Sequence, residues 1–478
     1  MTIHRRAQAG RPNQDNIPSP VRRALLAGVP AAGLAGFLAS CSSGGSSGGT
    51  GGGSGTSAKA SPVASASLAD ELKKPAEITF WAWTPDTQKE VDLFQAAYPN
   101  IKVKLVNAGQ GAPEYTKLRT ALKAGSGVPD AVQIEFQYIP TFSLQDNLLD
   151  MSRYGADESV QKQFVDWTWK QASPNGHVYG IPWDSGPMGL LYRKDIFDKY
   201  QIEVPKTWDD FATSAKKLHA AAPGISMTNL ANNDVGAFLS LMWQAGSRPF
   251  SNLDKNNQMR INVSDDKAKK VADFFTPLVQ SGAVSTDPDF NNDWYQGLAN
   301  GKYATWFSAA WGPIFLQGSA AKSAGKWRAA PLPQWDPANP KSGNWGGSTI
   351  AVTKQTKYPA AATAFAIFMM SNKQTTSMFS KTQFLFPTAK AVLNDPSYID
   401  QKLPFYGGQQ VNRVFADIAT TVGEDFEWDP FHDYVTSAAD GTFGKALSGK
   451  TSLSAGLDAW QANLVKYAKS QGVKVVTS

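Results

Sequence analysis

The sequence has very little of several residue types that carry common protein chemistry. Its 478 residues include one cysteine, so no internal disulfide bond can form. The four histidines, His4, His177, His219 and His432, have no metal-ligand spacing. No Gly-x-Ser-x-Gly nucleophile elbow follows a predicted strand, so acyl hydrolysis lacks its signal. We therefore expect no metal, no cofactor and no catalytic residue, and interpret the chain as a non-enzyme.

Charge is sparse, whereas aromatic residues are abundant. Charged residues make up 18 % of the chain. Its 46 basic and 40 acidic residues give a net charge of +6, and the basic residues form no continuous run. This pattern excludes nucleic acid as a partner. Aromatic residues reach 11 %, with 15 tryptophans, whose flat rings fill cores and also stack on flat ligands. The length allows two or three domains with sizeable cores.

Residues 1–41 are predicted to be a targeting segment. Arginines at 5, 6, 22 and 23 precede an apolar run over 24–39 of about 16 residues, which is shorter than the roughly 20 of a membrane-spanning helix. The run ends in Leu38-Ala39-Ser40-Cys41, which resembles a bacterial lipobox. The resemblance implies that Cys41 becomes the lipidated N-terminus. The arginine pair is also similar to a twin-arginine signal, so either export route fits.

Residues 42–75 are predicted to be a disordered tether. The segment is dominated by Gly, Ser, Thr and Ala and has too few apolar residues to form a core. A lipidated cysteine followed by a flexible tether places the folded part at the outer face of the cytoplasmic membrane.

The first folded segment alternates predicted strands and helices. Apolar patterns predict strands at 77–83, 101–107 and 131–136, with a helix between each pair. This order favours a parallel α/β sheet, in which ligands bind beyond the carboxyl ends of the strands. Two further extended segments, 178–182 and 186–193, are predicted on either side of a turn that contains Asp184.

Several motifs further along the chain share an order with one protein family. They include Gly127-Val-Pro-Asp130, Tyr192-Arg-Lys-Asp-Ile-Phe, Val-Pro-Lys-Thr-Trp208-Asp-Asp-Phe, Trp311-Gly-Pro and Trp345-Gly-Gly-Ser. Together they resemble the extracellular solute-binding proteins of ABC importers, in the carbohydrate-binding group that includes maltose-binding protein. The resemblance covers nearly the whole chain.

This resemblance implies a periplasmic-binding-protein-like fold with two α/β lobes, joined by crossover strands around a ligand cleft. The implied crossovers lie near 192–195, 342–348 and 384–390. The N-terminal lobe would contain 76–192 and 346–385, and the C-terminal lobe 193–345 and 386–478. The implied function is capture of a sugar by cleft closure and its delivery, as a monomer, to the membrane subunits of the importer.

Candidate ligand-binding residues are aromatic and planar polar side chains at strand ends, loops and crossovers. Such groups stack on sugar faces and bind sugar hydroxyls. Trp311 and Trp345 are favoured because glycine follows each of them. The full set is Trp83, Gln110, Glu135, Gln137, Tyr138, Trp183, Asp184, Trp243, Trp306, Trp311, Trp345, Gly346, Gly347 and Phe384.

Three other residues or segments have two readings. Asp130 precedes its strand and is expected to be a structural cap, whereas Arg193 fits either a hinge ion pair or a ligand contact. The acidic-aromatic cluster over 424–429 fits a ligand rim or a solvated helix end.

Ser264 is expected to cap a helix whose first turn holds two aspartates.

Two alternative functions stay open at this stage. A glycoside hydrolase needs two carboxyl groups in a cleft, and Glu135 and Asp184 form such a pair on paper. A solute-binding protein for a polyol or another non-sugar fits as well. The loops at 84–86, 108–114 and 136–140 contain no basic residue, which favours a neutral ligand.

Overall fold

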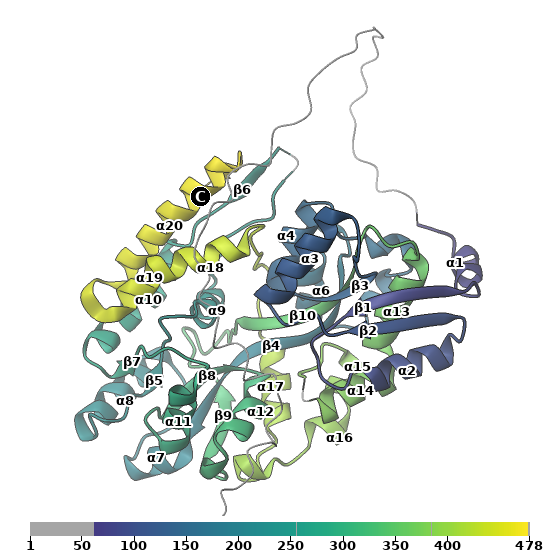
Figure 1. The fold of residues 1–478 in the computed structure, drawn as a ribbon. Helices are drawn as coiled ribbons and strands as arrows, with labels where there is room; N and C mark the ends of the chain where they lie inside the picture. Colours follow the sequence, from purple (N-terminus) through teal and green to yellow (C-terminus); the bar gives the residue numbers. More distant parts are fainter. Residues whose placement is uncertain (1–61, 255, 384, 477–478) are drawn as a thin grey trace, which may run out of the picture. The chain divides into compact units, whose positions relative to one another are not determined.

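The computed structural model describes residues 62–254, 256–383 and 385–476 (Figure 1). The predicted signal segment with Cys41, most of the predicted tether and Phe384 lie outside the described residues. Within the described part of the chain, no helix is long and apolar enough to cross a membrane.

The end of the predicted tether differs from the prediction. Helix α1 spans Ser65–Glu71, and just before it the Val63 N–H donates to the Arg153 carbonyl at 2.9 Å. Leu72, which follows the helix, packs against the core that contains Phe80. The Ala and Leu residues of this stretch favour a helix, and its leucines give it a surface to pack with, so order begins before residue 75.

The central sheet has seven strands in the order β2-β1-β3-β10-β4-β8, and β9 also pairs with β4. As predicted, β1 runs parallel to both β2 and β3, whereas β10 is antiparallel to β3 and β4. The strands of this sheet are β1 (Ala76–Trp81), β2 (Ile101–Val106), β3 (Ala131–Glu135), β4 (Gly180–Arg193), β8 (Thr305–Ala309), β9 (Trp327–Pro331) and β10 (Asn344–Val352).

Strand β4 overturns the predicted turn at Asp184. It is one continuous strand of 14 residues, nearly all buried. The turn-forming residues are satisfied inside the sheet, because Asp184 accepts a hydrogen bond from the Ser348 N–H at 3.0 Å and the Ser185 N–H donates to the Phe386 carbonyl at 3.0 Å. Strand β4 pairs with β10 as far as Pro187 and with β8 from Met188. The change of partners therefore precedes the predicted crossover near 192–195.

Helices surround this sheet, and two two-stranded sheets lie apart from it. The helices are α2 (Gln88–Ala97), α3 (Ala112–Ala124), α4 (Ile139–Leu144), α5 (Glu158–Gln161), α6 (Asp166–Ala172), α7 (Lys194–Lys199), α8 (Trp208–Ala221), α9 (Gly236–Gln244), α10 (Asp266–Gln280), α11 (Asn292–Asn300), α12 (Gly312–Ser319), α13 (Pro359–Ser371), α14 (Lys373–Thr382), α15 (Lys390–Leu393), α16 (Pro396–Ile399), α17 (Val411–Ala419), α18 (His432–Gly441), α19 (Phe443–Lys445) and α20 (Leu453–Ser470). The small sheets pair β5 (Thr228–Asn229) with β7 (Val284–Ser285) and β6 (Gln258–Arg260) with β11 (Lys474–Val476).

Helix starts follow from local capping chemistry. Thr207 and Asp210 form a reciprocal capping box at the start of α8. At α10 the prediction of Ser264 as cap is wrong, since the Asp265 carboxylate accepts from the Ala268 N–H at 2.7 Å. Ser264 instead donates to Asp458.

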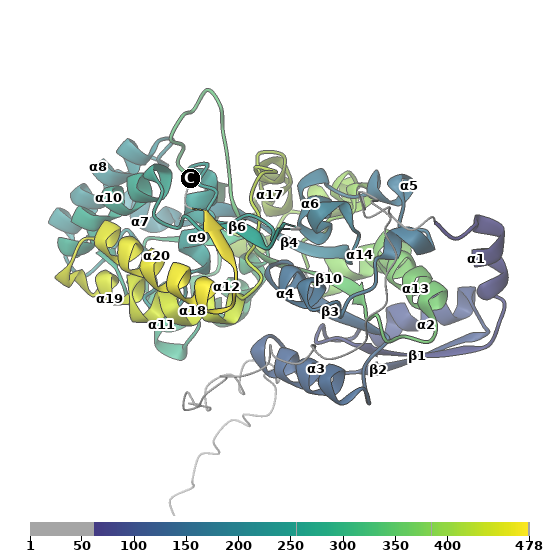
Figure 2. The ribbon, with the colours of Figure 1, turned by 90° about the horizontal axis from the view of Figure 1, so that it is seen from above.

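Separate hydrophobic cores form on the two sides of the β4–β10 pair. One core packs β1 and β2 against α2 and α13 through residues such as Phe80, Phe94 and Phe365. Another packs α8, α9, α10 and α20 through Trp208, Phe275 and other apolar side chains. Figure 2 shows these two groups of helices on opposite sides of the described structure, with β4 and β10 between them. The predicted lobe boundaries themselves stay a prediction.

Candidate ligand-binding site

The first wall of the candidate site is built at the carboxyl end of β3. Glu135 is half-buried, and its carboxylate accepts a hydrogen bond from the Tyr115 hydroxyl at 3.0 Å. The same hydroxyl accepts from the Glu135 N–H at 3.0 Å, which fixes the side chain at the strand end. Burial raises the pKa of Glu135, and the Tyr115 hydrogen bond opposes part of that rise.

A second carboxyl group lies behind this wall. Glu114 on α3 is fully buried, and neither carboxyl oxygen has a hydrogen-bond partner among the described residues. Burial, together with the charge of Glu135, raises the pKa of Glu114 to about 9. Glu114 therefore keeps its proton at neutral pH.

A second wall is aromatic. The ring centroid of Trp345 lies 5.2 Å from that of Trp311 and 5.7 Å from that of Phe290. The Trp311 Nε1–H donates to the Trp345 backbone carbonyl at 2.8 Å, which ties the Trp311 indole to strand β10. Phe290 has φ of 53°, an uncommon backbone conformation for a bulky residue, which turns the loop before α11 toward these rings.

Two carboxyl groups accompany the aromatic wall. Asp289 precedes Phe290, is 7 % exposed, and leaves one carboxyl oxygen without a partner in the described structure. Its N–H donates to the Asn233 side chain at 3.0 Å, which brings Asp234 alongside. Burial and the charge of Asp234 raise the pKa of Asp289 to about 8. A Cβ atom built on Gly236 would lie 2.9 Å from Asp234 Oδ1 and 2.4 Å from Trp345 Nε1, so this carboxyl group adjoins the indole.

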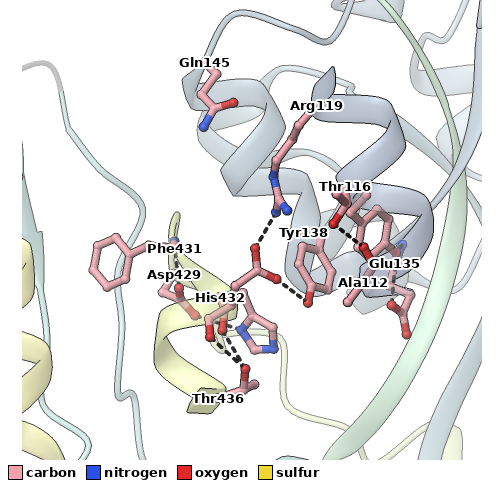
Figure 3. Close-up of polar contacts among 12 residues, drawn as sticks. Ala112, Thr116, Arg119, Glu135, Tyr138, Gln145, Asp429, Phe431, His432 and Thr436 are labelled. Carbon is pink, nitrogen blue, oxygen red and sulfur yellow. Dashed lines mark hydrogen bonds and ion pairs between the residues drawn. The ribbon is translucent and has the colours of Figure 1, made fainter. Parts of the chain in front are cut away.

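The start of α18 packs beside the first wall. His432 binds Asp429 through Nδ1 at 3.0 Å, and its ring meets Tyr138 edge-on with centroids 5.4 Å apart. A positive charge on His432 would lower the pKa of both Glu135 and Asp234. Figure 3 shows Tyr138 and Glu135 on one side of His432, and Asp429 on the segment that leads into α18.

Residues 81–376 match the bacterial extracellular solute-binding protein family. The chain belongs to this family. The arabinooligosaccharide-binding protein of Halalkalibacterium halodurans is 25 % identical over 73 % of this chain and 80 % of its own length. The lactose-binding protein of Rhizobium radiobacter is 26 % identical over 61 % of this chain and 69 % of its own length.

Solved structures give the same assignment. A binding protein of an ABC transporter from B. animalis subsp. lactis Bl-04, in complex with β-1,6-galactobiose, is 32 % identical over 84 % of this chain and all of its own, with a TM-score of 0.71. A galacto-N-biose/lacto-N-biose I-binding protein from Bifidobacterium longum is 26 % identical over 84 % of this chain and 99 % of its own, with a TM-score of 0.73. The predicted two-lobe α/β fold and family are confirmed.

Six of the predicted residues lie in or beside the two walls of this solute-binding protein. They are Glu135, Tyr138, Trp311, Trp345, Gly346 and Gly347. The two glycines have φ of 75° and 103°, which glycine adopts without strain. Tyr138 differs from its prediction in one respect, since its hydroxyl donates to Asp433 at 2.9 Å and is already engaged.

Three of the predicted tryptophans are packed in cores, and Trp306 among them also packs on Trp311 of the aromatic wall, with ring centroids 6.3 Å apart. Trp183 is 4 % exposed and packs on Phe379 with ring centroids 4.8 Å apart, beside a cavity that holds at most about one water molecule. Trp306 is buried against Trp294. Trp243 stacks on Phe426 at 4.3 Å and 8°. A buried indole gains more from this apolar packing than from a solvent-facing position.

Asp184 stays a prediction, and its Oδ1 accepts hydrogen bonds from the N–H and the hydroxyl of Ser348 between β4 and β10. Burial raises the pKa of Asp184. The remaining three polar or aromatic predictions stay predictions: Trp83 and Gln137 are half-buried, and Gln110 is exposed.

Asp130 and Arg193, two of the residues with two readings, have structural partners. Asp130 accepts from the Thr79 N–H at 2.8 Å, as a cap does. Arg193 pairs with Asp195 at 2.7 Å. Sequence reasoning missed Asp234, Asp289 and Phe290, since aspartates in a loop are usually turn formers. Their signal was the polar loop that follows a short strand in each case.

Proposed function

We propose that this protein captures a short oligosaccharide between its lobes and delivers it to an ABC importer. The supporting observation is the pairing of the aromatic wall of Trp345, Trp311 and Phe290 with the carboxyl groups of Asp234 and Asp289. Sugars offer apolar C–H faces to aromatic rings and hydroxyl donors to carboxyl oxygens. The same wall therefore provides both contacts that a sugar ring needs.

The charge balance of the site fits a neutral, hydroxyl-rich ligand. Within the described residues, no Lys or Arg forms an ion pair with Glu135, Asp234 or Asp289. A buried carboxyl group without a cation needs hydrogen-bond donors to offset its lost hydration. Sugar hydroxyls supply such donors, whereas a phosphorylated ligand would need a cationic partner.

Galactose-containing disaccharides are the first ligands to test. The relatives named above bind β-1,6-galactobiose, lacto-N-biose or lactose, and others are arabinooligosaccharide-binding proteins. Isothermal titration with these sugars, with maltose and with glycerol separates an oligosaccharide from a polyol. We expect saturable binding of at least one disaccharide and none of glycerol. Binding of glycerol alone, or release of monosaccharide during the titration, would replace the proposal with the polyol or glycoside-hydrolase alternative.

We propose further that Cys41 carries a lipid that anchors the protein outside the cytoplasmic membrane, where it works as a monomer. The support is the lipobox-like sequence followed by a Gly/Ser-rich segment. In producing cells, Cys41→Ala should move the protein from the membrane fraction to the medium. Equal membrane retention of the variant and the unaltered protein would contradict the anchor.

A further inference from the structure

Asp433 on α18 contacts two side chains from the other lobe. Its Oδ1 accepts from the Tyr138 hydroxyl at 2.9 Å, and its Oδ2 lies 2.6 Å from Arg119 Nη2 in an ion pair. Helix α18 packs through Val435 into the core that contains Trp208. Tyr138 packs into a different core, together with Tyr115 of α3. The three side chains therefore join elements that belong to opposite lobes.

We infer that Asp433 is a positioning residue for lobe closure, which raises the affinity for every ligand without touching any of them. This inference rests on the proposed function, in which the lobes close on a sugar. In the open form Asp433 would separate from both donors. The contact would then be made only on closure, and its free energy would favour the closed form.

The two donors are held in place by contacts within their own lobe. Tyr138 is 8 % exposed, and its ring lies against that of Tyr115 with centroids 4.1 Å apart. The Arg119 guanidinium lies over the Phe142 ring, 5.4 Å from its centroid. Donors that are already ordered lose little conformational entropy when an acceptor arrives. Figure 3 shows Arg119 and Tyr138 pointing toward the start of α18.

The position of Asp433 next to His432 connects this contact to the ligand site. His432 reaches Glu135 and Asp234 electrostatically, whereas Asp433 reaches Arg119 and Tyr138. Consecutive residues of α18 thus have different roles: His432 acts on the two walls, and Asp433 contacts the opposite lobe. Movement of the start of α18 on ligand binding would bring Asp433 to its donors.

The size of the effect is limited by solvent. The side chains of Arg119 and Asp433 are 31 % and 49 % exposed, so water and salt screen the ion pair. The buried Tyr138 hydroxyl adds a hydrogen bond to a charged acceptor, which is stronger than a neutral one. Together they predict a change of about three- to ten-fold in the closed-to-open ratio.

The test uses Asp433→Asn, with Asp458→Asn as the matched control. Asp458 forms an ion pair with Lys269 at 2.9 Å within one lobe and is similarly exposed, at 56 %. Titration with β-1,6-galactobiose and with lactose should show the same three- to ten-fold loss of affinity for both sugars in Asp433→Asn, because a smaller closed fraction scales every apparent Kd equally. The control should bind both sugars as the unaltered protein does. A loss confined to one sugar would show that Asp433 contacts ligand and would overturn the inference.

A ligand-free measurement separates this inference from the proposed function. The variants Lys104→Cys on β2 and Lys469→Cys on α20, at exposed positions, carry the two fluorophores, and Cys41→Ala removes the native thiol. Single-molecule energy transfer between the fluorophores reports the separation of the lobes. The high-transfer fraction without sugar should fall about three- to ten-fold in Asp433→Asn, and the exchange Arg119→Asp with Asp433→Arg should restore part of it. An unchanged fraction overturns the inference even where sugars bind. A reduced fraction supports it even where none of the sugars tested binds.

Discussion

At the scale of single residues, tryptophans with similar sequence surroundings have different roles. Trp311 and Trp345 were predicted as ligand contacts from their glycine neighbours, and they lie together on the aromatic wall. Trp183 was predicted from its place in an expected turn, but the turn is part of β4 and its ring points into a core. The direction of a side chain on a strand depends on where the strand begins and ends, which local composition determines poorly.

Trp311→Ala should weaken disaccharide binding by about ten-fold, because the half-buried ring would no longer stack on the sugar or hold Trp345 in place. Isothermal titration with β-1,6-galactobiose measures this loss. The control is Trp183→Phe, which keeps an aromatic ring in the core and should leave the Kd within about two-fold. Equal effects of both variants would mean that the aromatic wall is not the binding surface.

Glu114→Gln should make the protein less sensitive to alkaline pH. The folded protein holds the Glu114 proton up to about pH 9, whereas the unfolded chain releases it near the ordinary glutamate pKa of 4.5. The free energy of unfolding therefore falls as pH rises through this window, and glutamine removes the titration. Between pH 5.5 and pH 9 the Tm of the unaltered protein should fall further than that of Glu114→Gln, by about 2 °C or more.

Differential scanning calorimetry at both pH values gives this comparison. Glu203→Gln, at an exposed glutamate, serves as the control and should follow the unaltered protein. Parallel Tm curves for Glu114→Gln and the unaltered protein would show that Glu114 is ionised in the fold.

At the scale of elements, helices and parallel strands were predicted well, whereas long antiparallel strands were not. Helix α13, Pro359–Ser371, has local signals in its sequence, namely a first-turn proline and an Ala-rich run. The prediction divided β4 at Asp184-Ser185-Gly186. The hydrogen-bond partners of Asp184 and Ser185, which are Ser348 and Phe386, lie far away in sequence. No local pattern reports such partners. The site inherits this limit, since Ser348, three residues after Trp345 on β10, pairs with Glu135 on β3.

Gly186→Ala tests the close approach of β4 and β10. A Cβ atom there would lie 2.0 Å from the Trp345 carbonyl oxygen and 3.0 Å from Trp311 Nε1, so the strands must separate and the aromatic wall must shift. We expect a loss of about 1–3 kcal/mol in the free energy of unfolding, together with weaker disaccharide binding. Urea unfolding and isothermal titration measure the two effects.

Gly318→Ala, within α12, is the matched control for this substitution. No atom lies within 4 Å of an added Cβ there. Alanine in a helix should stabilise the protein by up to about 1 kcal/mol, with binding unchanged. If both variants unfolded at the same urea concentration as the unaltered protein, the strand contact would be looser than described.

At the scale of the whole molecule, the two-lobe fold could be predicted from sequence, whereas a contact between the lobes could not. The order of motifs along the chain predicted the two-lobe fold and the family correctly. The contact of Asp433 with Arg119 and Tyr138 has no counterpart in the sequence, because the residues are about 300 positions apart and each is ordinary in its own helix or loop. Contacts between lobes depend on how complete folded units meet, which periodicity does not describe.

Ligand should therefore act on the molecule as a whole, by shifting it toward the closed form. A sugar that contacts Glu135 on one wall and Asp289 on the other binds fully only when the lobes are together, so saturation should lower the radius of gyration. Small-angle scattering with and without β-1,6-galactobiose measures this change, and glycerol at equal concentration is the control. The same sugar at 100 times its Kd should stabilise the fold by about 2.7 kcal/mol. Stabilisation without compaction would show that the sugar binds to a single lobe, and closure would then have no part in capture.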